Sequence, residues 1–393
     1  MADSPDLGID VDIDVDTELD DVREELRSIT RRVVEQRCPI DRVRSLANDP
    51  IGFDEPLWRE AADLGWLGLE IPESYGGAGM SFAELAVVLD ELGRGLVPLP
   101  VLSSVVLGTS AILVGGSDEQ RSEWLPALAA GERRLAVAMT GESGRVGFEA
   151  LGVAATIGGG GVHLAGDAGF VADAHVADAF VVAARVGESI QLMLVSAGAD
   201  GIRVTVELSH DQTRRLATVE FDGVKVTHAA RLSGGDALYD WLIDRAAIAL
   251  AIDSHGGARR AMETTVQYAK DRIQFGRPVG SFQAVKHRCA NMFVNVETSR
   301  VAADVAARTL PVGPGKPSRW ASIAKSHAAD AYVAVADSGI RVHGGIGFTW
   351  EHDMHLYLRR AKLNQALFGS SVWHRQRLAE MLVAERNNRE LVG

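Results

Sequence analysis

A short basic segment between two predicted helices carries the side chains best suited to bind a phosphorylated ligand. It covers residues 268–292 and contains Arg272, Gln274 and Phe275. A guanidinium group can form paired hydrogen bonds to phosphate, an amide can bind a polar edge, and an aromatic ring can stack on a planar group. A turn must follow Gln274, because glycine opens the backbone there and Pro278 cannot continue a helix. The segment is therefore a candidate site for a planar, phosphorylated molecule.

A plainer interpretation of the same segment stays open. The turn covers residues 275–280, and Arg277 adds a second guanidinium group to that of Arg272. Arginines at the end of a helix also stabilise its unpaired carbonyl groups and its dipole without any ligand. Because short motifs are common, spacing alone favours this structural role.

The order of residues from about 55 to 390 resembles the acyl-CoA dehydrogenase family. The central segment matches through Arg272, Gln274-Phe275-Gly276 and Pro278, and a later one through Gly344-Gly345-Ile346-Gly347. Upstream matches are Leu57-Trp58, Leu64-Gly65-Trp66, Ile71-Pro72-Glu73 and Tyr75-Gly76-Gly77-Ala78-Gly79. The resemblance specifies the family but not the acyl group, so steroid, branched and aromatic acyl thioesters all remain open.

The resemblance implies an activity and a cofactor. Members of the family remove hydrogen from the α and β carbons of an acyl-CoA with FAD, and a carboxylate takes the α-proton. An electron-transfer flavoprotein is then the expected electron acceptor. Seven residues match family positions around the ADP half of FAD, most of which lies in a neighbouring subunit. They are Arg272, Gln274, Phe275, Arg341, Gly344, Gly345 and Gly347, with Arg341 in place of a usual glutamine.

The catalytic base is missing from both positions where the family carries it. One position is Phe368 here and the other is Ala246, and neither side chain accepts a proton. Asp244 and Glu351 are the candidates for a substitute, but Asp244 lies about 200° around the helix from Ala246 and so faces elsewhere. We therefore predict no catalytic residue in this chain. His287 and His343 are expected to be structural.

The segments that face the flavin ring in the family are altered as well. Residues 140–146 keep only Thr140, and residues 166–172 keep only the aromatic Phe170, which a place in the core would explain equally well. Three functions follow from this pattern. The chain is a base-less subunit that pairs with a homologous chain carrying the catalytic Glu, a self-sufficient homotetrameric dehydrogenase, or a binding or scaffold protein without redox activity.

Composition narrows the remaining possibilities. The chain has 393 residues and a formal charge of −13, which argues against nucleic acid and fits a cytoplasmic protein. Cys38 and Cys289 do not form a metal-ligand pattern, so no metal is expected. The uncharged stretch 95–117 contains two prolines, which favours a buried helix at 101–114 over a membrane span.

Periodicity predicts a mostly helical α+β fold of three domains. A disordered acidic tail at 1–18 precedes an N-terminal helical domain at 19–134, a small antiparallel β-sheet or barrel at 135–232, and a C-terminal helical bundle at 233–393. Four glycines at 158–161 predict a hairpin. A helix at 320–338 is expected to end at Gly339. Apolar faces in excess of what one bundle needs predict an oligomer.

Overall fold

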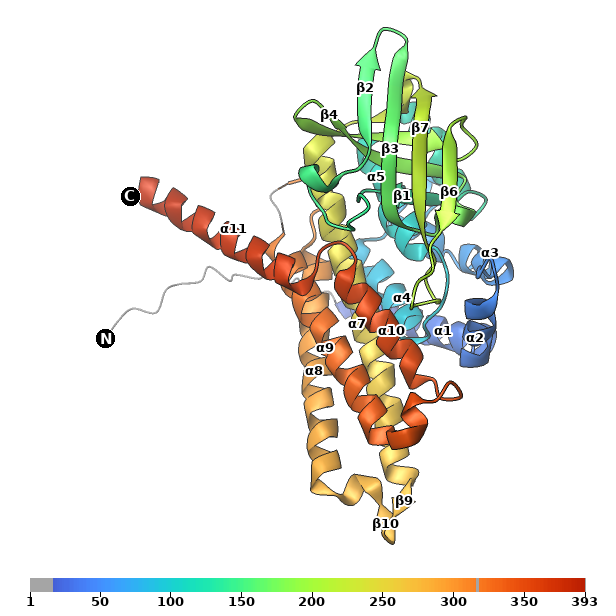
Figure 1. Cartoon of the computed structure of the whole chain (residues 1–393), viewed down its shortest axis with the longest axis vertical. Helices are drawn as coiled ribbons and strands as arrows, with labels where there is room; N and C mark the ends of the chain where they lie inside the picture. The colour runs from blue at the N-terminus through green and yellow to red at the C-terminus, as the bar shows by residue number, and fades with distance from the viewer. Residues whose placement is uncertain (1–16, 316–317, 393) are drawn as a thin grey trace.

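A computed structural model describes residues 17–315 and 318–392, so most of the predicted tail at 1–18 lies outside the described residues. Residues 17–134 are mainly helical (Figure 1). Its α-helices are α1 (Thr17–Arg37), α2 (Ile40–Asn48), α3 (Glu55–Asp63), α4 (Phe82–Arg94), α5 (Ser110–Gly115) and α6 (Asp118–Ala129). Ser81 and Glu84 form a capping box at the start of α4. The buried helix predicted at 101–114 is confirmed, but its first part, Val101–Thr109, is a π-helix.

The next part of the chain forms an eight-stranded sheet. Its strands are β1 (Leu135–Ala138), β2 (Ala154–Gly158), β3 (Gly161–Ala172), β4 (Ala179–Val186), β5 (Ser189–Ser196), β6 (Ile202–Val206), β7 (Leu216–Val226) and β8 (Arg231–Leu232). The order is β6-β7-β3-β2-β4-β5-β8, with β1 on β4. Most pairs are antiparallel, but β1 and β2 run parallel to β4. Gly158 pairs with Gly161 in the hairpin that the glycine run predicts.

A helical bundle completes the molecule. It contains α7 (Gly235–Asp271), α8 (Gln283–Thr309), α9 (Arg319–His343), α10 (Met354–Ala366) and α11 (Ser371–Val392). Helix α7 runs through the middle of the chain's core and packs on α4, α8 and α9, so residues on all its sides are buried between 238 and 258. Helix α11 projects away from the body of the protein (Figure 1). The predicted fold class, helical regions on either side of a sheet, is confirmed.

The predicted end of a helix at Gly339 is wrong. Helix α9 continues to His343, and Gly344, at φ +68°, is its C-cap. Gly339 lies inside the helix because a Cβ there would come within 2.9 Å of both the Thr265 hydroxyl and the Met354 sulfur. This glycine therefore permits close packing of α7, α9 and α10, and the left-handed residue that ends the helix comes five positions later.

A buried ion network fixes the bundle against the loop that joins β6 to β7. The guanidinium group of Arg360 in α10 lies 2.9 Å from Asp211 in that loop and 3.0 Å from Asp253 in α7. It also donates hydrogen bonds to Thr213. Burial alone would lower the pKa of Arg360, but the two carboxylates outweigh burial and raise it. Arg360 thus stays charged and holds the sheet and the bundle in one arrangement.

Candidate cofactor site and base position

The predicted turn after Gln274 is a short hairpin at one end of the bundle. Strands β9 (Ile273–Gln274) and β10 (Arg277–Pro278) pair across Phe275 and Gly276. Both central residues have positive φ, +52° and +74°, as a type I′ hairpin turn requires. Phe275, at the tip of the hairpin, is 89% exposed. Figure 1 shows β9 and β10 at the lower end of the molecule.

The side chains of the hairpin are supported mainly by one neighbouring ring. Phe275 meets Phe282 edge to face, with 6.0 Å between the ring centroids, and the Arg277 guanidinium lies 4.2 Å from the same ring. The Gln274 side chain donates to the backbone carbonyl of Ile273. Arg277 therefore has a packing role within the chain, whereas the outer surface of Phe275 remains open.

Arg272 is the residue of this group that is best placed for an external anion. It is exposed at the C-cap of α7. Within residues 17–315 and 318–392, no carboxylate lies within 4.0 Å of its guanidinium group. Arg341 differs, because its Nε donates to Asp337 one turn earlier on the same helix, at 2.8 Å. The free guanidinium of Arg272 keeps all its N–H donors for a ligand.

The segment Gly344-Gly345-Ile346-Gly347, called the glycine segment here, lies next to the end of α7. The ring of Tyr268 in α7 packs at 4.3 Å on that of His343, and its hydroxyl donates to the His343 carbonyl. The following 3-10 helix, Gly344–Phe348, thus sits near the hairpin. Apart from their neighbours along the chain, no atom of the described residues lies within 4 Å of where a Cβ would stand on Gly344 or Gly345, so a ligand can approach their backbone closely. Gly347 is different, because its missing Cβ makes room for the Ile340 carbonyl.

His343 is a packed residue with one free nitrogen. Its Nδ1 bonds to the Gly339 carbonyl at 2.8 Å, and its ring lies 4.3 Å from that of His352. Burial lowers the pKa of both histidines, so both are neutral at pH 7. The buried Nε2 of His343 has no hydrogen-bond partner in the described part of the chain. His287, in contrast, is exposed on α8.

Phe368, which the sequence predicts at the family's base position, is a buried and fixed side chain. Phe368 is 7% exposed and, like Gly369 after it, has a left-handed backbone, with φ of +52° and +95°. The Phe368 carbonyl is hydrogen-bonded by Nε2 of His374 at 3.1 Å, and the Gly369 carbonyl accepts from Nζ of Lys325 at 3.0 Å. Burial lowers the pKa of Lys325 to about 7 and that of His374 to about 3. We call residues 367–371 the base loop.

Lys325 and His374 were not identified from the sequence. Lys325 is 0% exposed, on a face of α9 that it shares with Ala321, Ala324 and Ala328. A lone lysine on an alanine face signals a buried cation, but nothing in the sequence indicates that its partner is the carbonyl of Gly369. That partner lies 44 positions away.

Neither candidate substitute base, Asp244 or Glu351, forms a direct hydrogen bond or ion pair with the base loop in the described part of the chain. Ala246 is fully buried. Asp244 accepts a hydrogen bond from the backbone of Ser318 at 2.7 Å and forms an ion pair with Arg377, so it joins α7 to the start of α9 and to α11. Burial raises the pKa of Asp244. Glu351 is exposed after the glycine segment. Both carboxylates thus have structural or solvent surroundings rather than an acyl pocket.

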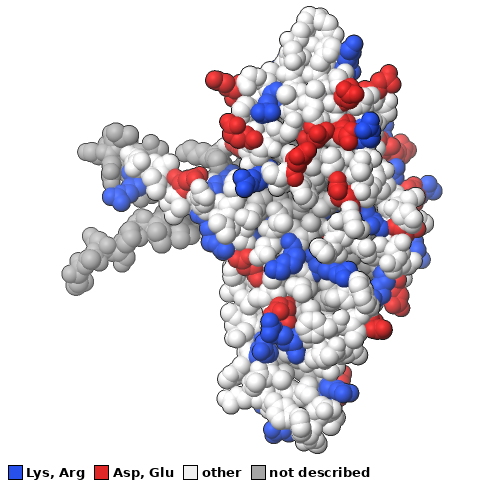
Figure 2. All heavy atoms as spheres, viewed as in Figure 1, with Lys and Arg blue, Asp and Glu red and all other residues white. Residues whose placement is uncertain are grey.

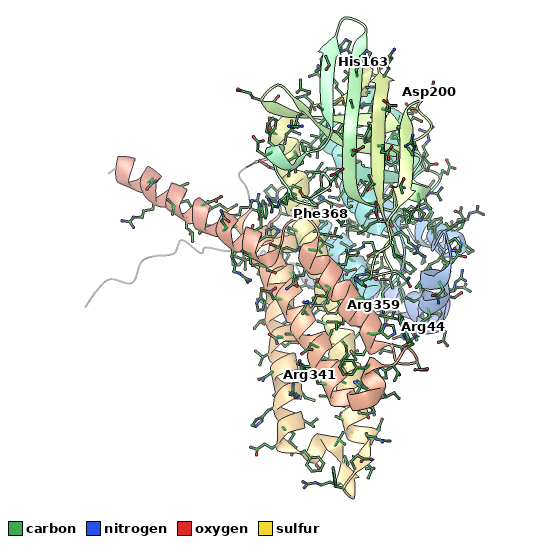
Figure 3. All side chains as sticks on the ribbon, in the orientation of Figure 1. Arg44, His163, Asp200, Arg341, Arg359 and Phe368 are labelled. Carbon is green, nitrogen blue, oxygen red and sulfur yellow. The ribbon has the colours of Figure 1, made fainter. Side chains whose placement is uncertain are left out.

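Phe368 and the candidate phosphate-binding residue Arg341 lie in different parts of the bundle (Figure 3). Phe368 lies at the end of the bundle that meets the sheet, and Arg341 further toward the hairpin. Of the two segments predicted to face the flavin ring, residues 166–172 belong to β3, whereas residues 140–146 lie in the loop that follows β1. There Thr140 donates to the Gly169 carbonyl at 2.6 Å. Phe170 is 41% exposed and lies against Gly144, so a core role for Phe170 is wrong.

Surface charge is unevenly distributed over the two regions. On the face shown in Figure 2, acidic side chains gather over the sheet, whereas arginine and lysine side chains are frequent over the helical bundle. None of the described helices is long and apolar enough to cross a membrane. The described residues also contain no group of three metal-binding side chains.

The two helical regions on either side of the sheet match the models of one protein family. Residues 20–132 match the acyl-CoA dehydrogenase N-terminal domain, and residues 235–383 match the acyl-CoA dehydrogenase C-terminal domain. The chain belongs to the acyl-CoA dehydrogenase family.

Several individual members of the family are similar to this chain over most of its length. Acyl-CoA dehydrogenase IpdE2 of Mycolicibacterium smegmatis is 34% identical over 88% of this chain and 94% of its own length. Acyl-CoA dehydrogenase FadE27 of Mycobacterium tuberculosis is 32% identical over 91% of this chain and 96% of its own. Among solved structures, a Tcur3481-Tcur3483 steroid ACAD variant aligns with TM-score 0.86 and 31% identity over 94% of this chain and 99% of its own. A chain of the ChsE4-ChsE5 complex of Mycobacterium tuberculosis aligns with TM-score 0.86 and 32% identity over 92% of this chain and 97% of its own length.

Proposed function

We propose that this chain is the base-less subunit of a heteromeric, FAD-dependent acyl-CoA dehydrogenase, and that a homologous partner chain supplies the catalytic Glu. The observation that carries the proposal is Phe368, a buried phenylalanine fixed in the family's base position. Ala246 at the second position is apolar and buried too. The similarity to the ChsE4-ChsE5 complex supports an assembly of two different chains.

FAD fits the exposed end of the bundle. Arg272 offers an unpaired guanidinium group for phosphate, Phe275 an exposed ring, and Gly344 and Gly345 an accessible backbone. Gln274 and Arg341 stand beside them with further donors, and Gly347 shapes the segment. When bound, FAD would accept the hydride that leaves the β-carbon of the substrate. These residues would bind and orient the ADP half, and nothing on this chain would take the α-proton.

The remaining partners follow from the family. The substrate in this proposal is an acyl-CoA with a steroid-type acyl group, since a 31% identical relative of known structure is a steroid ACAD. An electron-transfer flavoprotein would reoxidise the reduced cofactor. The hairpin and the glycine segment, both exposed in this chain, would be covered by FAD and by the partner subunit.

The decisive experiment compares the chain alone with the chain co-expressed with a base-carrying homologue. We expect no anaerobic flavin reduction by any acyl-CoA with the chain alone, because a positioned base contributes roughly 10² to 10⁴ in rate and water cannot replace it at pH 7. Reduction should appear with the partner and disappear when the partner's Glu is changed to Gln.

Two outcomes would contradict the proposal. Flavin bleaching by the chain alone that is lost in Asp244→Asn would show a self-sufficient enzyme. Failure to bind flavin with every homologue present would instead indicate a binding or scaffold protein. Restoring a carboxylate by Phe368→Glu alone should not give activity, because the altered segments at 140–146 and 166–172 would still hold the flavin ring poorly.

A further inference from the structure

A charged groove of about 580 Å³ lies between α1, α4, α7 and α8. None of its residues belongs to the hairpin, the glycine segment or the base loop. Six arginines and four carboxylates line its walls, each arginine pairs with at least one carboxylate of the chain, and small apolar side chains such as Ala86 and Ala303 form its floor. The arginines are Arg23, Arg27, Arg31, Arg259, Arg300 and Arg308. We call this space the arginine groove. Its volume is typical of small-molecule sites.

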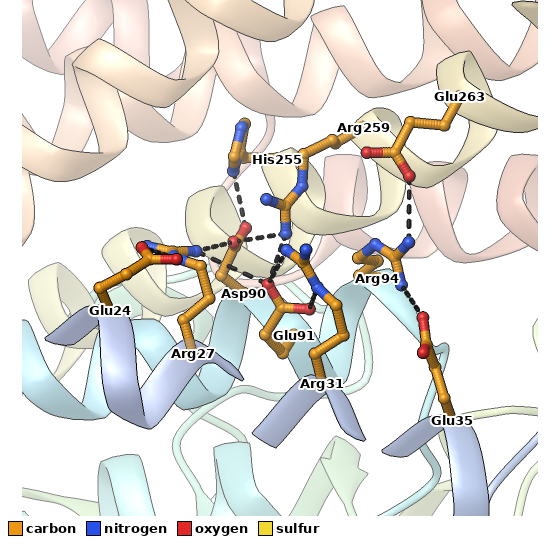
Figure 4. Close-up of polar contacts among 10 residues, drawn as sticks. All are labelled: Glu24, Arg27, Arg31, Glu35, Asp90, Glu91, Arg94, His255, Arg259 and Glu263. Carbon is orange, nitrogen blue, oxygen red and sulfur yellow. Dashed lines mark hydrogen bonds and ion pairs between the residues drawn. The ribbon is translucent and has the colours of Figure 1, made fainter. Parts of the chain in front are cut away.

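Two carboxylates of α4 organise the arginines at its centre (Figure 4). Asp90 pairs with Arg27 and Arg259, at 2.9 Å each, and Glu91 pairs with Arg31 at 2.8 Å and with Arg259 at 2.7 Å. Burial alone would raise the pKa of Asp90, but His255 and the two arginines hold it well below its usual range. Three guanidinium groups therefore meet two carboxylates, and each guanidinium has five N–H donors, so donors exceed acceptors here.

A buried nitrogen in the groove lacks a partner. His255 lines the groove and is 6% exposed, and its Nδ1 is held by Asp90 at 2.6 Å. Its Nε2 is buried without a hydrogen-bond partner in the described part of the chain, as is Nε of Arg259. Buried polar atoms are nearly always paired, and an unpaired one indicates a missing ligand or water. Nε2 can accept from a hydroxyl when the ring is neutral and donate to an oxyanion when it is protonated.

We propose that the arginine groove binds a small organic oxyanion, whose carboxylate or phosphate head contacts His255, Arg259 and Arg300 and whose apolar part lies on the floor between α4 and α8. Guanidinium groups suit both kinds of head because they pair with two oxygens at once. The inference does not rest on the proposed function, since the groove shares no residue with the cofactor candidates.

The binding test uses calorimetric titration of the purified protein in whatever assembly it forms. Phenyl phosphate and benzoate are the probes, inorganic phosphate tests the head alone, and benzylamine has a similar body with the opposite charge. We expect both aromatic anions to bind, inorganic phosphate to bind more weakly, and benzylamine not to bind. The two aromatic anions distinguish a phosphate ligand from a carboxylate ligand. Absence of binding by both would overturn the proposal.

Charge reversal at the rim locates the site. The Arg300 side chain is 54% exposed and pairs with Glu297 on its own helix, so Arg300→Glu leaves the buried ion pairs intact. It should weaken binding of the aromatic anions roughly tenfold, since a lost charged contact is replaced by repulsion.

Arg32→Glu is the matched control, because Arg32 is exposed on α1 and does not line the groove. It makes the same change in net charge and should leave binding nearly unchanged at physiological salt. His255→Gln, which keeps a donor for Asp90, should also weaken binding. Equal affinity in Arg300→Glu and the wild-type protein would place the anion elsewhere and overturn the assignment.

Discussion

The hairpin and the base loop both contain residues predicted at functional positions of the family, yet they differ in burial and in hydrogen bonding. At the hairpin, Phe275 and Gly276 take left-handed backbone conformations and the phenylalanine ring stands in solvent. In the base loop, Phe368 and Gly369 take the same conformations, but the phenylalanine is buried and both carbonyls are bonded from within the chain.

The difference indicates which of the two regions is stabilised by a ligand or another subunit. A left-handed phenylalanine is conformationally unfavourable, and the base loop offsets that cost with burial and two internal hydrogen bonds. The hairpin has its backbone pairing, but the Phe275 side chain itself makes only an edge contact with Phe282 among the ring contacts of the described residues. We infer that the base loop is complete within the chain, whereas the hairpin gains its remaining stabilisation from a bound ligand or subunit.

The largest expected effect is on stability. Phe368→Ala should lower the free energy of unfolding by about 3–5 kcal/mol, because a buried aromatic ring is lost and a cavity remains. Urea unfolding followed by circular dichroism measures it. Phe348→Ala is the control, since that ring is 76% exposed and its loss should cost about 0.5 kcal/mol or less. A cost below about 1 kcal/mol for Phe368→Ala would show that the ring does not complete the loop.

The next effect is on the cofactor. Arg272→Ala should leave stability of the free chain unchanged but weaken FAD binding by the assembled complex by about 1.5–3 kcal/mol, roughly ten- to a hundredfold, as a charged contact to phosphate is lost. Flavin content after gel filtration measures it. Lys270→Ala removes an equally exposed cation from the same helix end and serves as the control. Unchanged flavin content in Arg272→Ala would reject the assignment of the hairpin.

The order of elements was predictable from the sequence, whereas contacts between distant segments were not. The spacing of apolar residues predicted the two helical regions and the sheet between them, and the run of glycines predicted the β2–β3 hairpin. Gly339 was misread because only the packing of α7 and α10 against α9 shows why glycine is needed there. Phe170 was ambiguous for a related reason, since the exposure of a strand residue depends on what covers that face of the sheet.

The candidate site was predictable only in its residue types. Arg272 and Phe275 were recognised by their order, but the free guanidinium group and the exposed ring depend on which neighbours the fold brings near. The donors that hold the base loop, Lys325 and His374, come from two helices and have no common spacing. The arginine groove draws on four helices, so no local pattern could indicate it.

The last prediction concerns the pH dependence of the base loop, an effect that is small for each pH unit. Burial lowers the pKa of Lys325 to about 7 in the folded protein, from 10.5 in the unfolded chain. Between these values the unfolded chain binds more protons, so the contribution of Lys325 makes stability rise with pH. The slope from one proton is about 1.4 kcal/mol per pH unit in the middle of this window.

Lys325→Met should remove this rise. Urea unfolding of both proteins at several values between pH 7 and pH 9.5 measures the difference, and other titrating groups cancel in the comparison. Lys325→Arg sharpens the test, because arginine stays protonated over this range, so the rise should vanish while the charge remains buried. Parallel curves for the wild-type protein and Lys325→Met would show that the amine is not held in the low-dielectric interior behind Gly369, and the base loop would then be less complete than the comparison with the hairpin requires.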